Sequence, residues 1–212
     1  MTGVNGQRGY DATGRRDRAR QRRREIVLVA TEMFERRGYA VTVADIAERA
    51  GVSPETIYKS FGGKAGLLKE AFDQALAGDD EPVAVADRPE SRAIDAEPDI
   101  TTKLSMYATV AATRSHRAGR LMLVIRDGAR SDDALATLWA DALGQRLRGM
   151  TMLATHLAET GDLRTGVSME DARDTLWTLI SPEIYELLVV QRGWSVDGYR
   201  DWITRAMIAE LI

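Results

Sequence analysis

The sequence predicts an all-α protein with a three-helix N-terminal domain and a larger helical C-terminal domain. Apolar residues recur at helical spacing through most of the 212 residues, and no stretch keeps the alternation of a strand. Two complete helix-start signals, at Thr42 and Ser53, stand on either side of Gly51. An acidic stretch with three prolines, residues 78–99, follows the first helical region, and we expect a mobile linker there.

The first two N-terminal helices have clear boundary signals. The apolar period predicts a first helix from about Gln21, which ends at Gly38. Thr42 at the N-cap and Asp45 at N3 have the pattern of a capping box and open a second helix. Gly51 ends this helix, because glycine takes a positive φ at no steric cost.

The third and fourth helices follow directly. Ser53 at the N-cap, with proline after it, opens the third helix, and a glycine pair ends it. The fourth helix runs from about Lys64 to Ala77. We place the helix-turn-helix domain at residues 21–66 and the C-terminal domain at residues 67–212.

The C-terminal domain is predicted to be entirely helical. Pro182 lies inside its fourth helix, so we expect a kink or break near residues 178–181. Apolar stripes predict five helices, at Ile100–Ser115, Arg117–Arg126, Asp132–Thr160 and Met169–Gln191, with the last beginning at Ser195.

Composition excludes several classes of protein. The chain has no cysteine, so it has no disulfide framework and no thiolate metal site. His116 and His156 have no partner at metal-ligand spacing, and no paired carboxylates or phosphate-binding loop argue for catalysis. No apolar run reaches the length of a membrane span, and the N-terminus lacks the apolar core of a signal peptide. We therefore expect a cytoplasmic protein that is not an enzyme and has no metal, cofactor or membrane partner.

Charge is unevenly divided along the chain. Residues 1–70 carry 14 Lys and Arg against 9 Asp and Glu, whereas residues 71–212 carry 15 against 23. Only the basic part is therefore expected to meet a polyanion. Residues 1–20 have almost nothing to bury, which predicts a disordered arm that either is a solvated tail or contacts DNA. The candidate contacts of this arm are Arg15, Arg16, Arg18 and Arg20.

The third helix has a polar face suited to reading DNA. Hydroxyls and a lysine in its N-terminal half can reach base edges or phosphates. The helix N-termini at Thr42 and Lys64 direct backbone N–H groups outward, which suits a phosphate. The alternative is a plain helical hairpin with a polar face. The exposed candidates on the third helix are Ser53, Thr56, Tyr58 and Lys59.

The segment TVADIAERAGVSPETIYKSFGGKAGLL resembles the N-terminal domain of the TetR family of transcriptional regulators. The Thr-Val start, the AGVS turn, the T-I-Y-x-x-F helix and the later Lys with a Leu pair carry the resemblance, which covers about residues 22–76. It implies a C-terminal domain for ligand binding and dimerisation. It also implies phosphate contacts for Thr42, Tyr58 and Lys64, a major-groove position for Thr56 and Lys59, and a position near the DNA backbone for Ser53.

Two residues depart from the family pattern. Gly63 stands where the family often has Ser or another capping residue, so the turn is expected to be looser. Ser60 replaces the more usual His or Asn, which leaves the base preference open.

The segment Leu176–Val190 is apolar over most of its circumference. Such a helix is buried on all sides, at the centre of a core or at a subunit interface. We favour a four-helix dimer interface with two helices from each subunit, and a purely intramolecular core is the alternative. The predicted interface residues are Leu176, Ile180, Ile184, Leu187, Leu188, Trp202 and Ile203.

Aromatic and methionine side chains of the middle helices could line a pocket for a small hydrophobic ligand. Such side chains at helical spacing are more often plain core. The candidate liners are Tyr107, Met122, Trp139, Met150, Met152 and Trp177.

We interpret the chain as a homodimeric, sequence-specific DNA-binding regulator of transcription with a palindromic operator. The favoured mechanism is a repressor that a small-molecule ligand releases from DNA. A ligand-independent regulator and an activator of the same fold stay open. The alternative from another class is an all-helical binding or enzyme domain whose N-terminal hairpin is incidental.

Overall fold

The computed structural model describes residues 7–79 and 88–212, with side chains described from residue 14 onward. The described residues form helices and contain no strand, which confirms the predicted all-α class. The chain divides into two compact units, Met1–Ala71 and Phe72–Ile212. The boundary therefore lies inside the fourth helix, α4 (Lys64–Ala77), and not at residue 66 as predicted. Among the residues described, no helix is long and apolar enough to cross a membrane.

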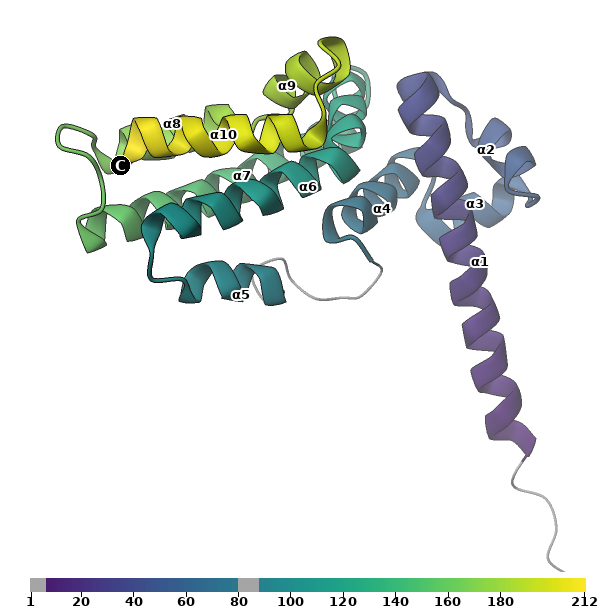
Figure 1. The fold of residues 1–212 in the computed structure, drawn as a ribbon. Coiled ribbons are helices and arrows are strands. Elements are labelled where there is room, and N and C mark those ends of the chain that lie inside the picture. The colour runs from purple at the N-terminus through teal and green to yellow at the C-terminus, as the bar shows by residue number, and fades with distance from the viewer. Residues whose placement is uncertain (1–6, 80–87) are drawn as a thin grey trace, which may run out of the picture. The chain divides into compact units, whose positions relative to one another are not determined.

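Unit 1 is a small helical domain (Figure 1). It contains α1 (Gln7–Arg37), η1 (Gly38–Ala40), α2 (Val43–Arg49), α3 (Pro54–Phe61) and the first part of α4. Its core is apolar because each helix turns one stripe inward. The fully buried core side chains include Phe34, Val41, Ile46, Ile57, Leu67 and Leu68.

Helix α1 is longer than predicted. It begins at Gln7 and so includes residues 7–20, which we expected to be disordered. The apolar period from Gln21 marks only where the helix starts to pack on the core. The arginine, glutamine and alanine residues before that point are good helix formers, which extends the helix past α2 and α3 (Figure 1). Residues 1–6 of the predicted arm lie outside the described residues.

Unit 2 is a larger helical bundle. Its long helices pack around one apolar cluster, and α10 lies beside α8 and over α6 (Figure 1). After the end of α4, the unit contains α5 (Pro89–Ala96), α6 (Ile100–Gly128), α7 (Asp133–Thr160), α8 (Met169–Leu179), α9 (Pro182–Tyr185), η3 (Glu186–Gln191) and α10 (Val196–Leu211).

The predicted mobile linker is partly wrong. Residues 88–99 contain the helix α5, with Pro89 as its first residue and Ile94 buried. Arg88, before this helix, is buried and forms a bidentate ion pair with Asp79 at 2.7 and 3.0 Å. Acidic composition alone could not show that one apolar side chain and one ion pair hold the segment on the bundle. Residues 80–87 lie outside the described residues.

The two helices predicted over residues 100–126 are a single helix, α6. The polar run at residues 114–117 spans the predicted break. Those polar side chains have partners on other helices of unit 2. Arg114 reaches Glu90 at 3.7 Å, and the His116 ring nitrogen lies 3.2 Å from the hydroxyl of Tyr185. Since the polar groups are satisfied there, the helix continues through them.

The break near Pro182 is confirmed. Helix α8 ends at Leu179, and the Ser181 side chain accepts a hydrogen bond from the Ile184 N–H at 3.2 Å to cap α9. The six residues of η3 then form a π-helical turn, in which the Arg192 N–H donates to the Leu187 carbonyl at 3.1 Å. Helices α7 and α10 begin directly after Asp132 and Ser195, the residues at which they were predicted to start.

Candidate nucleic-acid interface

The start of α2 is held by the predicted capping box. The Asp45 N–H donates to the Thr42 hydroxyl at 3.1 Å, and the Thr42 N–H donates to the Asp45 carboxylate at 3.2 Å. The bond from the Thr42 backbone, with the Arg37 guanidinium 3.0 Å away, lowers the pKa of the Asp45 carboxyl. Thr42 is exposed, and its hydroxyl hydrogen is still available to a phosphate oxygen.

The start of α3 is held by a pair of hydroxyls. The Thr56 N–H donates to the Ser53 hydroxyl at 3.3 Å, and the two hydroxyl oxygens lie 3.0 Å apart. Both side chains are therefore fixed at the N-terminal end of the helix, where backbone N–H groups favour an anion. The exposed face of α3 also carries Tyr58, which is 58% exposed, and Lys59. The opposite face is buried through Ile57 and Phe61.

The turn between α3 and α4 requires both glycines. Gly62 and Gly63 have φ values of +75° and +117°, which side-chain-bearing residues rarely adopt. A Cβ atom on Gly63 would lie 3.4 Å from Cε1 of Tyr58, so the tyrosine ring rests against this turn.

Lys64, at the start of α4, is attached to Tyr39. Its ammonium donates to the Tyr39 carbonyl at 2.8 Å and lies 3.8 Å from the centroid of that ring. An ammonium has three hydrogens, so this attachment orients the group and leaves capacity for a phosphate.

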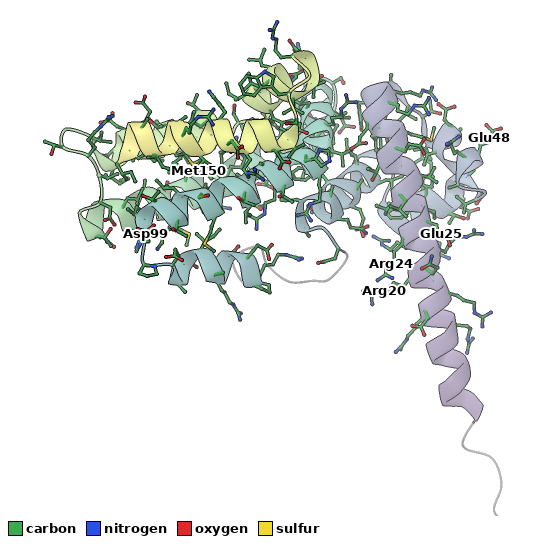
Figure 2. The ribbon with its side chains drawn as sticks, viewed as in Figure 1. Arg20, Arg24, Glu25, Glu48, Asp99 and Met150 are labelled. Carbon is green, nitrogen blue, oxygen red and sulfur yellow. The ribbon has the colours of Figure 1, made fainter. Side chains whose placement is uncertain are left out.

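The arginines of the predicted arm lie on α1. The Arg18 guanidinium Nε donates to the Gly14 carbonyl one turn earlier, at 3.0 Å. Figure 2 shows Arg20 and Arg24 one turn apart on the same side of the helix. The four candidate arm residues, all exposed, are Arg15, Arg16, Arg18 and Arg20.

The structure brings the six predicted DNA contacts into one small domain, on α3 and at the starts of α2 and α4. Two short helices joined by a tight turn, the second with an exposed polar face and a buried apolar face, define a helix-turn-helix DNA-binding protein. A family model described as bacterial regulatory proteins of the tetR family matches residues 26–71. The helix-turn-helix domain of this chain belongs to the TetR family of bacterial regulatory proteins.

Similar proteins extend this assignment along the chain. The HTH-type transcriptional regulator YdeS of Bacillus subtilis (strain 168) is 28% identical over 184 residues, which cover 85% of each chain. The HTH-type transcriptional repressor BdcR of Escherichia coli (strain K12) is 30% identical over 61 residues, which cover 28% of this chain and 31% of that protein. The expectation that the chain is not an enzyme agrees with membership of a family of regulators.

The fold of most of the chain is also found among solved structures. A transcriptional regulator from Saccharomonospora viridis, solved in complex with choline, has a TM-score of 0.68 at 21% sequence identity. The alignment covers 89% of this chain and 96% of that one. The likeness confirms the predicted fold, with the helix-turn-helix domain and a helical body.

The predicted interface residues divide into three groups by exposure. Leu176 and Ile203 are fully buried in the core of unit 2, so their prediction as interface contacts is wrong. The apolar stripe of a helix does not reveal which of its residues face the helix's own bundle. Leu187 is 49% exposed. The others are half-buried and pack against the core cluster, namely Ile180, Ile184, Leu188 and Trp202.

The predicted pocket residues are only partly brought together. Tyr107, Met150 and Trp177 belong to the core cluster of unit 2 or pack against it, and the Tyr107 hydroxyl donates to the Met150 sulfur at 3.1 Å. Met122 and Trp139 do not join that cluster, and Met152 is 68% exposed. Helical spacing predicted which residues are apolar, and it could not predict which of them meet.

The sequence interpretation missed two arginines, one in each unit, that join neighbouring helices. Arg146 of α7 lies over the Trp177 ring, 4.4 Å from its centroid, and donates to the Trp177 and Ile180 carbonyls at 3.1 and 3.3 Å. It therefore caps the end of α8. Arg23 of α1 contacts the end of α3. Their partners are remote in sequence, so no local signal marks either residue.

Proposed function

We propose that this regulator is a homodimeric repressor that binds a palindromic operator and leaves it when a small molecule binds unit 2. The observation that carries the DNA-binding part is the outward polar face of α3, with Tyr58 and Lys59 exposed and the opposite face buried. Hydroxyls fixed at the N-terminal end of that helix suit contacts to phosphates and base edges.

Dimerisation is supported by the geometry of DNA reading and by surface composition. One α3 helix offers few base contacts, and paired heads bind half-sites about one DNA turn apart. Large apolar side chains remain on the surface of unit 2 around η3. Leu187 is 49% exposed, and Val190 and Trp194 are each 38% exposed. A second copy that covers these residues would remove apolar surface from water.

Ligand control is supported by the core of unit 2 and by its link to α4. The regulator from Saccharomonospora viridis, which has a similar fold, was solved in complex with choline. In this chain, Tyr107, Met150 and Trp177 are the candidate contacts for a small hydrophobic ligand. Arg117 of α6 donates to the Leu76 carbonyl at the end of α4, at 3.4 Å, and α4 is continuous with the helix-turn-helix domain. A ligand that favours one position of α6 needs a coupling of about 1–3 kcal/mol to change operator affinity roughly 5–150-fold.

The test is specific binding to the DNA upstream of its own gene. We would measure fluorescence anisotropy at physiological salt, with an unrelated duplex as competitor, for the wild type and for Tyr58→Ala and Lys59→Ala. Arg205→Ala, which removes one charge from an exposed position of α10, is the matched control. Loss of specific binding in the first two variants alone supports the proposal. Specific binding that survives both changes would show that α3 is not the DNA-reading helix.

Ligand release needs its own measurement. A thermal-shift screen of small hydrophobic molecules, choline included, identifies stabilising compounds, because a ligand that binds only the folded state raises the melting temperature. Each stabilising compound is then added to the protein–operator complex. Release of the DNA supports a ligand-controlled repressor, and a complex that no stabilising compound changes argues for ligand-independent regulation.

A further inference from the structure

Arg23 joins three helices of the DNA-binding domain through one guanidinium group. It lies on α1 and forms a bidentate pair with Glu70 of α4, with nitrogen–oxygen distances of 3.0 and 3.3 Å. A third nitrogen donates to the Ser60 carbonyl in the last turn of α3, at 2.6 Å. The guanidinium carbon lies 4.3 Å from the centroid of the Phe61 ring. One side chain therefore contacts the end of α3 through both backbone and side chain.

These contacts compensate for the shortness of α3. The helix has eight residues, Pro54–Phe61, and the carbonyls of its last turn have few partners within the helix. A cation at that end satisfies one carbonyl and interacts favourably with the helix dipole. The same helix carries Thr56 and Tyr58. A shift at its C-terminal end therefore moves the side chains that read DNA.

We propose that Arg23 is a positioning residue for DNA reading, which holds α3 at a fixed angle to α4 through Ser60, Phe61 and Glu70. This inference rests on the function proposed above. Arg23 itself does not contact DNA, and it affects operator affinity only through the position of α3. Glu70 shares that effect because it orients the guanidinium through a bidentate bond.

A simpler reading is that Arg23 is one more positive charge near the DNA. The two readings predict opposite signs for Glu70→Gln. Removing a negative charge from this domain strengthens attraction to phosphates, so a purely electrostatic role predicts tighter binding. A positioning role predicts weaker binding, because a neutral amide does not hold the guanidinium in the same way.

Arg22 provides a matched control for Arg23. It is the preceding residue on α1, and its ion pair with Glu25 is loose at 3.9 Å. Replacing either arginine by methionine removes one charge and keeps most of the apolar side-chain length. Arg23→Lys keeps the charge but cannot make the planar fork and reach a third acceptor. The variants therefore separate charge from geometry.

The experiment measures operator affinity between about 50 and 300 mM salt, a range in which phosphate contacts make the affinity strongly salt-dependent. Arg23→Met and Arg23→Lys are expected to lose about tenfold in affinity and Glu70→Gln several-fold, whereas Arg22→Met changes it less than about threefold. The salt slope of Arg23→Met should equal that of Arg22→Met, because each loses the same charge. Melting curves establish that the variants are folded at the assay temperature, and Arg23→Lys serves if Arg23→Met is not.

Three results would overturn the positioning role. They are wild-type affinity in Arg23→Lys, tighter binding in Glu70→Gln, or equal losses in Arg22→Met and Arg23→Met. Each of these leaves the proposed function intact if Tyr58→Ala still abolishes specific binding. Failure of the wild type itself to bind any operator removes the proposed function, and the positioning role with it.

Discussion

Gly66 lies in the first turn of α4 with its Cα facing the end of α3. A Cβ atom at this position would overlap the carbonyl oxygen of Phe61 and lie 3.1 Å from its carbonyl carbon. Both are backbone atoms, so no side-chain rotation can relieve the overlap. The close approach follows from the tight turn at Gly62 and Gly63, two residues that alone separate the end of α3 from the start of α4. We therefore predict that Gly66→Ala destabilises unit 1.

The magnitude follows from two opposing effects. Alanine in place of glycine within a helix stabilises by about 1 kcal/mol. Overpacking against fixed atoms destabilises by about 1–3 kcal/mol, and the upper end applies here because the obstacle is backbone. The net loss is therefore about 2 kcal/mol. For a unit that ends at Ala71, this corresponds to a melting temperature lower by roughly 10 °C.

The assay uses the location of the tryptophans. All four lie in unit 2, at residues 139, 177, 194 and 202, so their fluorescence reports unit 2 and far-ultraviolet circular dichroism reports both units. Gly149→Ala on α7 is the control, because an added Cβ there meets nothing within 4 Å. It should raise the melting of unit 2 by about 3 °C, as expected from helix propensity alone.

An unchanged or higher melting temperature in Gly66→Ala would refute the reasoning. It would mean that α4 relaxes away from α3 at no cost, and helix propensity would then decide the sign. A loss in Gly149→Ala equal to that in Gly66→Ala would show that the packing of the two positions does not differ as the structure indicates.

Three further outcomes are expected. Leu187→Glu should convert a dimer into monomers and weaken operator binding, and a sedimentation profile identical to the wild type would contradict the interface. Deletion of residues 1–20 should weaken operator binding and flatten its salt dependence, and unchanged binding would exclude a role for the arm. Because the pKa of Asp45 is lowered in the folded state, its stabilising contribution is present above the unfolded value near 3.8 and is lost as pH falls through the folded value. In urea unfolding, the difference between the wild type and Asp45→Asn should therefore shrink below about pH 4, and a constant difference would contradict the assignment.

The features that the sequence predicted best are those encoded within a few residues. The caps at Thr42 and Ser53, the break before Pro182 and the start of α10 each depend on neighbours within one turn. Errors arose where local patterns have no access to tertiary partners. Residues 88–99 were predicted to be a linker from their acidic composition. The ion pair between Arg88 and Asp79 joins residues on either side of an acidic stretch, and composition does not reveal it.

The candidate site shows the same limit. The polar face of α3 follows from helical periodicity, so its exposed residues could be predicted. Arg23 could not be predicted, because its acceptors on Ser60 and Glu70 lie 37 and 47 residues away in the sequence. Leu176 and Ile203 could not be separated from the exposed apolar residues, since a hydrophobic stripe does not distinguish a protomer's own core from a partner's surface.

The π-helical turn η3 has a consequence for how this chain compares with its relatives. A π turn holds one residue more than an α turn of the same height, so it accommodates a single inserted residue without disturbing the helices on either side. If the π turn at Glu186–Gln191 arose by insertion of one residue, alignments with chains that keep an α-helix there would show a one-residue gap. By the same reasoning, deletion of one residue from this segment should be tolerated by the local backbone, whereas a one-residue deletion in the middle of α7 would rotate half of that helix away from its core.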